Sequence, residues 1–183
     1  METESGGFKS ILLVEDDPRD VKLTLAALAE DNLANRVAVV EDGAEALDYL
    51  YHRGKFNGGV RGNPSLVLLD IKIPKVSGLE VLKIIKADEE LKIIPVVVFS
   101  ASREAPDLIE CYKHGVNTYV VKPLDSVDFM KAVQQLGICW AAGNEPPPPA
   151  KRAEAPRQSR EAVSAAEEEV KNEIPAPHPA SGR

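Results

Sequence analysis

L-V-L-L-D, at residues 66–70, is a run of four apolar residues that ends in an aspartate. A short, continuous apolar run of this kind predicts a strand that is buried on both faces, as in parallel sheets. The pattern recurs on either side of it. F-K-S-I-L-L-V at 8–14 precedes the acidic E-D-D at 15–17, and the apolar run ending at Phe99 precedes Ser100. We therefore expect a fold that repeats a buried strand with a polar residue at its end.

Amphipathic segments separate these strands. Apolar residues recur at helical spacing in five segments, at 18–30, 44–52, 77–87, 105–114 and 125–140. The strands that alternate with them are predicted at 8–14, 36–40, 66–69, 93–99 and 117–121. Five strand–helix pairs of this kind predict an α/β fold with a doubly wound parallel sheet and right-handed crossovers.

Charge and hydropathy exclude several functional classes. The 183 residues include 22 Lys and Arg against 29 Asp and Glu, a net charge of -7, and such a chain offers no basic face for nucleic acid. No apolar run approaches the ~18 residues of a membrane span, and the acidic N-terminus lacks a signal-peptide pattern. We therefore expect a cytoplasmic protein, in which Cys111 and Cys139 are buried small hydrophobic residues and do not form a disulfide.

The composition changes sharply at Glu145. Eight of the 14 prolines follow it, among residues that are mostly Ala, Glu, Arg, Lys and Ser. Such a segment buries too little apolar surface to offset the entropy lost on ordering. The sequence therefore predicts a folded domain at 8–144 and a disordered tail at 145–183.

Charged and hydroxyl groups follow four of the five strands. They are the acidic stretch 15–17, then Asp70, Ser100 and Lys122. In doubly wound folds the carboxyl ends of the strands form the site. Clustered carboxylates with only oxygen ligands favour Mg²⁺, and a carboxylate beside Mg²⁺ can attack a phosphoryl group. Lys122 and Ser100 would neutralise and position that group.

Each of these residues has an ordinary structural explanation when it is taken alone. An Asp or a Ser after a strand is usually a helix cap or turn residue, and Asp17, just before Pro18, fits a helix cap. A Lys-Pro step, as at Lys122, is usually an exposed turn. Four such residues at four strand ends, in this order, favour a functional site.

Several motifs together resemble the receiver domains of bacterial response regulators. They are V-E-D-D at 14–17, L-L-D at 68–70 with I-P-K and Gly78 behind it, F-S-A at 99–101 and Y-V-V-K-P at 119–123. The likeness spans about residues 8–140. It implies a flavodoxin-like (βα)5 sheet with strand order 2-1-3-4-5. It also implies a stand-alone regulator that takes a phosphoryl group from a sensor histidine kinase and signals through protein–protein contact.

The resemblance assigns a role to each matching residue. Asp70 would be the phosphoacceptor. The Mg²⁺ ligands would be Asp16, Asp70 and the backbone carbonyl of Lys72, with Glu15 acting through water. The phosphoryl contacts would be Ser100 and Lys122, and the aromatic switch residue would be Tyr119. Lys72 is larger and more charged than the residue that many relatives have there, and Ser100 replaces the commoner Thr.

The sequence also resembles one subgroup of these regulators and predicts a dimer face. The long linker at 51–65 is similar to that of single-domain regulators paired with bacterial phytochrome kinases. A homodimer is predicted through the fourth helix, fifth strand and fifth helix. The last helix has more large apolar side chains than one core-facing stripe needs, so some of them are expected at the surface. They are Phe129, Met130, Ile138 and Trp140.

Two other functions fit the sequence less well. An aspartyl-phosphate phosphatase usually has Asp-x-Asp at its nucleophile, whereas Asp70 is followed by Ile71 and Lys72. The missing second acid predicts a signalling module and not an enzyme. A degenerate receiver used only as a scaffold is disfavoured because the acidic pair, Asp70 and Lys122 are all present.

Overall fold

Five parallel strands form the centre of the computed structural model, which describes residues 10–30, 33–58 and 62–143. The strands are β1 (Ile11–Val14), β2 (Val37–Val40), β3 (Leu66–Leu69), β4 (Val96–Ser100) and β5 (Thr118–Val121). Their order in the sheet is β2-β1-β3-β4-β5, which confirms the predicted flavodoxin-like topology.

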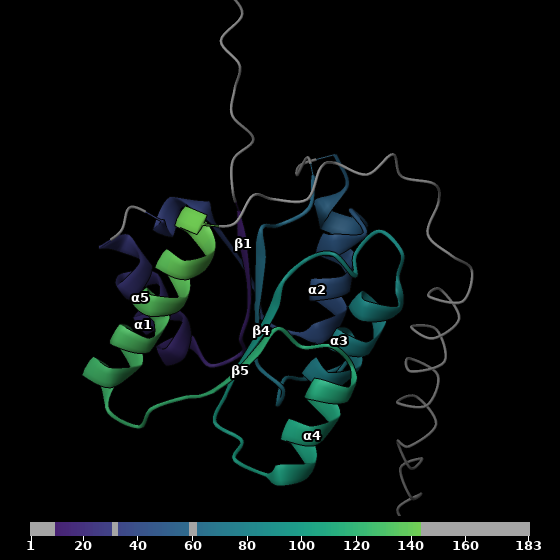
Figure 1. Ribbon diagram of the computed structural model, residues 1–183. Helices are drawn as coiled ribbons and strands as arrows, with labels where there is room; N and C mark the ends of the chain where they lie inside the picture. The colour runs from purple at the N-terminus through teal and green to yellow at the C-terminus, as the bar shows by residue number, and fades with distance from the viewer. Residues whose placement is uncertain (1–9, 31–32, 59–61, 144–183) are drawn as a thin grey trace, which may run out of the picture. The chain divides into compact units, whose positions relative to one another are not determined.

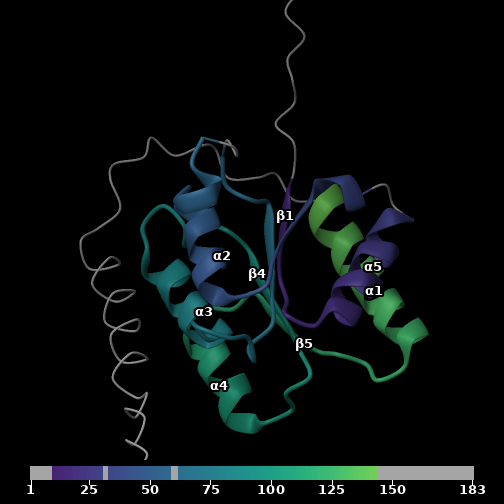
Figure 2. The same cartoon turned by 180° about the vertical axis from the view of Figure 1, so that it is seen from behind.

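Helices cover both faces of this sheet. They are α1 (Pro18–Ala29), α2 (Gly43–Leu50), α3 (Gly78–Ala87), α4 (Ala105–Lys113) and α5 (Ser126–Gly143), with short 3₁₀ turns at Ala34–Arg36 and Gly54–Phe56. Figures 1 and 2 show α1 and α5 together on one face, and α2, α3 and α4 on the other. Because each helix returns the chain to the start of the next parallel strand, all five strands end at the same edge of the sheet.

Burial follows position in the sheet. Every residue of the three central strands β1, β3 and β4 is buried, whereas the edge strands β2 and β5 are mostly part-exposed. The core extends from these strands to α5 through an edge-to-face contact of Phe99 and Phe129, whose ring centroids lie 4.9 Å apart. Cys111 is a free, buried thiol, as predicted, and the side chain of Cys139 lies outside the described residues.

The fourth strand begins later than the sequence pattern indicates. It starts at Val96 and not at Ile93, because Pro95 has no N–H to donate to a sheet and the residues before it form turns. The strand also includes Ser100, which was expected just beyond it. The 3₁₀ turns at Ala34–Arg36 and Gly54–Phe56 were not predicted, since such short turns have no apolar period.

Side chains cap the first turns of α1 and α3. Asp17 accepts a hydrogen bond from the backbone N–H of Arg19 at 2.7 Å, which confirms its expected role as a helix cap. Ser77 and Glu80 form a reciprocal capping box at the start of α3. Both caps fix helices whose first turns lie beside the polar edge of the sheet.

The predicted dimer face is wrong for Phe129 and lies partly outside the described side chains. Phe129 is only 3% exposed and belongs to the core, and Met130 is partly buried against the same cluster. The side chains of Ile138 and Trp140 are among those not described. Val127, in the first turn of α5, is 59% exposed. The face of α5 that packs on the core includes Phe129, Met130, Val133 and Leu136.

Candidate functional site

Four of the predicted site residues lie together at the carboxyl edge of the sheet. Glu15 follows β1, Asp70 follows β3, Ser100 ends β4 and Lys122 follows β5. All four side chains are buried, although each is polar or charged. Buried polar groups need partners, so this cluster implies a network of hydrogen bonds.

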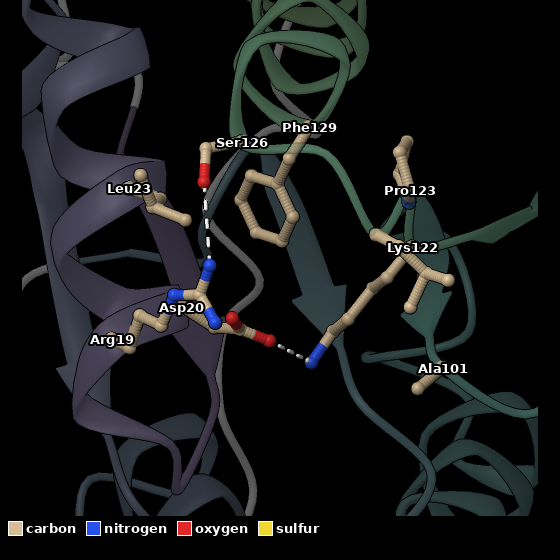
Figure 3. A pocket seen from close by; sticks show the side chains of 9 residues that line it. Arg19, Asp20, Leu23, Ala101, Lys122, Pro123, Ser126 and Phe129 are labelled. Carbon is tan, nitrogen blue, oxygen red and sulfur yellow. Dashed lines mark hydrogen bonds and ion pairs between the residues drawn. The ribbon is translucent and has the colours of Figure 1, made fainter.

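The Lys122 ammonium is the centre of that network. Its Nζ lies 2.5 Å from Asp70 Oδ2, 2.6 Å from Glu15 Oε2 and 2.9 Å from Asp20 Oδ2. Figure 3 shows Asp20 extending from α1 toward this ammonium. Asp20 was not predicted as a site residue from the sequence. The sequence feature that could have indicated it is its place in the first turn of α1, close to the acidic stretch 15–17.

Charge is not balanced within this cluster. Burial alone would lower the pKa of Lys122, but its hydrogen bonds to Asp70, Glu15 and Asp20 outweigh burial and raise that pKa. Burial also raises the pKa of Glu15, against the opposing effect of the Lys122 hydrogen bond. One ammonium therefore faces three carboxyl groups, and a further cation would be favoured here.

Both carboxylate oxygens of Asp70 have donors. Oδ1 accepts the Ser100 hydroxyl at 2.5 Å and the backbone N–H of Lys72 at 3.1 Å, while Oδ2 accepts from Lys122. The carboxylate is thus held in one orientation by groups from three different strand ends. Such fixed donors and charges would also meet the oxygens of an incoming anionic group.

A second network connects this site to α4. The Tyr119 hydroxyl donates to the backbone carbonyl of Ser102 at 3.0 Å, and the Ser102 hydroxyl donates to Asp107 Oδ2 at 2.6 Å. Asp107 also forms an ion pair with Lys72, whose Nζ lies 3.4 Å from Asp107 Oδ2 and whose side chain is exposed. Tyr119 therefore contacts the loop after Ser100. The bridge from Lys72 to α4 was not predicted, because its residues are 35 positions apart.

The residues at this edge have the chemistry of a site for a hard divalent cation. Asp16 is exposed next to the buried Glu15, after β1, and the buried Asp70 follows the neighbouring strand β3. These carboxylates and the carbonyl of Lys72 all offer oxygen ligands. Within the described part of the chain, no three acidic, His or Cys side chains converge closely enough to enclose a metal. The donor set fits an open Mg²⁺ or Mn²⁺ site, which keeps several waters, better than a closed cage.

A small pocket of about 140 Å³ opens next to Lys122, between α1 and the start of α5. The Arg19 guanidinium donates to the Ser126 hydroxyl across it at 3.3 Å. Phe129 and Pro123 form part of its apolar wall, and Lys122 closes its inner side (Figure 3). The pocket therefore leads from the surface toward the charged cluster.

Backbone contact at Gly78 fixes the position of Asp70. A Cβ at Gly78 would lie 2.0 Å from the Asp70 carbonyl oxygen, so only glycine allows this approach. We expect Gly78→Ala to destabilise the fold by about 1–3 kcal/mol or more, as overpacking does, and to slow any reaction at Asp70. Thermal unfolding and a phosphorylation assay would measure the two effects.

Gly43→Ala is the matched control for Gly78→Ala. A Cβ there would lie 2.0 Å from the Val76 carbonyl oxygen, at the far end of the same loop and away from Asp70. We expect a similar loss of stability with a much smaller loss of reactivity. Equal losses of reactivity in the two variants would contradict a specific role for Gly78 in placing Asp70.

Comparison with known proteins identifies the class of this chain. Residues 11–134 match the family described as the response regulator receiver domain, so the chain belongs to the response-regulator receiver family. Among curated relatives, a probable methanogenesis regulatory protein, FilR2 of Methanothrix harundinacea, is 41% identical over 140 residues, 76% of this chain and 88% of that protein. Response regulator Rcp1 of Synechocystis is 37% identical over 140 residues, 76% of this chain and 94% of Rcp1.

Solved structures of phytochrome-associated regulators share the fold. The phosphorylated cyanobacterial phytochrome response regulator RcpA has a TM-score of 0.71 at 37% identity, covering 76% of this chain and 98% of RcpA. The Mn²⁺-bound form of Rcp1 has a TM-score of 0.71 at 35% identity, covering 76% of this chain and 99% of Rcp1. The bacteriophytochrome response regulator RtBRR is 49% identical with a TM-score of 0.62, covering 88% of this chain and 96% of RtBRR.

The helices of the described residues include no candidate for crossing a bilayer, since none is both long and apolar enough.

Proposed function

We propose that this receiver accepts a phosphoryl group on Asp70, with Mg²⁺, from a sensor histidine kinase. The observation that supports it most is the Asp70 carboxylate, which contacts the Lys122 ammonium at 2.5 Å and the Ser100 hydroxyl at 2.5 Å. A nucleophile, a fixed cation and a fixed donor are the groups that phosphoryl transfer needs from a protein.

The chemistry is a transfer between two nucleophiles. An Asp70 oxygen forms a bond to phosphorus as the phosphorus–nitrogen bond of a donor phosphohistidine breaks, and the imidazole leaves with the bonding electrons. Lys122 offsets the charge that spreads over the phosphoryl oxygens, and the Ser100 hydroxyl donates to one of them. When bound, Mg²⁺ supplies the remaining charge neutralisation.

The proposed metal ligands are those that the sequence indicated. Asp16 and Asp70 would bind Mg²⁺ directly, the Lys72 carbonyl would be the third protein ligand, and Glu15 would act through water. The oxygen-only donor set and the excess of carboxylates over the single ammonium of Lys122 support this assignment. The Mn²⁺-bound form of the relative Rcp1 supports it further.

Partner, location and output are proposed by analogy with the relatives. A phytochrome-type histidine kinase is the proposed donor, because RcpA and RtBRR are described as phytochrome response regulators. The module would act in the cytoplasm, as a signalling protein and not an enzyme, through protein–protein contact. The domain at 8–144 carries this activity, and the proposed disordered tail at 145–183 lies outside the described residues. The homodimer stays a prediction.

The test is direct phosphorylation of the full chain. Incubation with acetyl phosphate and Mg²⁺ should give one phosphate that hydroxylamine removes, as acyl phosphates require. Borohydride reduction followed by mass spectrometry should place it at residue 70. A hydroxylamine-stable phosphate, or a label at Ser100 or another residue, would refute the proposal, and omission of Mg²⁺ is the control.

Mg²⁺ affinity should depend on Asp16 more than on Asp17. Asp16→Ala removes a proposed ligand, and we expect affinity to fall by roughly tenfold or more, about 1.4 kcal/mol. Asp17→Ala removes only a helix cap, at a cost of about 1 kcal/mol in stability. Calorimetric titration with Mg²⁺ would compare the two, and equal losses of affinity would show that the ligand assignment is wrong.

A further inference from the structure

A second charged concavity lies between α3 and α4, away from Asp70. It encloses about 500 Å³, and the charged side chains that line it are all basic: Lys83, Lys86, Lys92, Lys113 and His114. Gly78 at the start of α3 contacts Asp70, whereas Lys86 lies eight residues further along the helix, a distance of roughly 12 Å. The two sites are therefore separate.

The fold gathers these lysines from three segments. Lys83 and Lys86 project from the second half of α3, Lys92 precedes β4, and Lys113 ends α4. Figure 1 shows α3 and α4 as neighbours on one face of the sheet. The lining of the concavity has four ammonium groups and no carboxylate. This local positive charge contrasts with the net charge of -7 of the whole chain.

Lys86 is held in place without losing its charge. Its ammonium donates to the backbone carbonyls of Lys92 and Ile94, at 3.2 and 2.8 Å, and to the side-chain oxygen of Asn117 at 3.1 Å. These acceptors are neutral, so they hold the ammonium in position but do not neutralise its positive charge. Burial lowers the pKa of Lys86, which shows that its charge is poorly solvated. A nearby anion would stabilise this ammonium.

The other lysines are available to a ligand. Lys92 and Lys113 form exposed ion pairs with Glu89 and Glu110, each three residues earlier in the chain, at 2.7 and 2.8 Å. Exposed pairs of this kind contribute about 0–1 kcal/mol and exchange readily with other partners. Both ammonium groups can therefore turn toward an anion at small cost.

Helix dipoles explain only part of this cluster. Lysines in the last turn of a helix favourably oppose the negative end of its dipole, and Lys86 and Lys113 hold such positions. Lys83 lies nearer the middle of α3, and Lys92 follows the helix. The helix dipole therefore does not explain the positions of Lys83 and Lys92.

From this convergence, we propose that the concavity binds a compact polyanion of several linked phosphate groups, recognised by charge. Lysine binds phosphate as a point charge, and several phosphates are needed to contact ammonium groups that come from three segments. The lining has no aromatic ring other than the imidazole of His114, so a nucleotide base would add little. Affinity should therefore be similar for inorganic tripolyphosphate and ATP.

The test is an NMR titration of the full chain, with tripolyphosphate and with ATP, at low salt and without Mg²⁺. We expect saturable shifts of the backbone amides around Lys83, Lys92 and Gly115, weakening as salt is added. Lys83→Gln/Lys113→Gln should lower the affinity at least tenfold. Phosphorylation by acetyl phosphate should be unchanged in this variant, because neither lysine contacts the Asp70 site.

Lys55→Gln/Lys131→Gln is the matched control, since it removes two exposed, ion-paired lysines from other elements. We expect its affinity to change less than twofold. Equal weakening in both double variants would show binding by net charge alone, an adventitious ion only, and would overturn the proposal. Shifts centred on Lys122, no saturation in the millimolar range, or a strong preference for ATP would also overturn it.

Discussion

Asp70→Asn is expected to abolish phosphorylation while leaving the fold intact. Asparagine keeps the shape of the side chain and an oxygen that can accept the Ser100 hydroxyl, but its amide cannot act as the nucleophile. The substitution also removes one of three carboxyl groups around a single ammonium, so stability should hold or rise slightly. Phosphate incorporation and the thermal midpoint would be measured together.

Asp17→Asn is the matched control for Asp70→Asn. It makes the same chemical change three residues after β1, at a helix cap that asparagine satisfies equally well. Phosphorylation should continue at the rate of the unmodified chain. Residual hydroxylamine-sensitive phosphate on the Asp70→Asn protein would contradict the assignment of Asp70 as the phosphoacceptor.

Lys122→Met is expected to lower the free energy of unfolding by about 3 kcal/mol at neutral pH, near the low end for breaking a buried ion pair. The ammonium compensates Glu15 and Asp70, which are both buried. Without it these carboxylates lose their cation inside the protein. Phosphorylation should also fall strongly, because the fixed positive charge beside Asp70 is gone.

The loss in Lys122→Met should depend on pH. Without Lys122, the pKa of Glu15, already raised by burial, should rise further. The folded variant then binds protons more tightly than the unfolded chain, so its stability should increase as pH falls from 7 toward 5. Urea unfolding at several pH values would show the difference from the unmodified chain narrowing over that window. A constant difference would contradict this account.

Lys92→Met gives the control for an exposed ion pair. Lys92 Nζ lies 2.7 Å from Glu89 Oε2, nearly as close as the Lys122 contacts, but the two side chains are 44% and 84% exposed. Its removal should cost less than about 1 kcal/mol. If both lysine variants lost the same stability, burial of Lys122 would not be the cause of the larger effect.

The sequence predicted the sheet and the centre of the site for one physical reason. Strand ends are marked locally, by a polar residue after an apolar run, and parallel strands with right-handed crossovers bring those ends to one edge. Asp70, Ser100 and Lys122 needed no further information. The order β2-β1-β3-β4-β5 came from the family resemblance, because periodicity alone does not specify which strands are neighbours.

Features that depend on side-chain packing were not predicted from the sequence. The contact of Asp20 with Lys122 and the bridge from Lys72 to Asp107 join residues with no local relation in the chain. Phe129 was expected at a surface because large apolar residues are abundant in α5. Its contact with Phe99 depends on how that helix lies against the sheet. Tertiary contacts of this kind follow from the fold and not from a pattern.

The two loops beside Asp70 differ in how they are held, and this predicts unequal rates of amide hydrogen exchange. The loop from β3 to α3 buries Ile71, Ile73 and Val76, and the backbones of two glycines press against it. Ala101 to Glu104, before α4, bury no apolar side chain and depend on a few polar contacts. Opening of the second loop should therefore cost far less free energy. Asp70 is on the rigid side of the site, so rearrangement on the opposite side can occur without moving it.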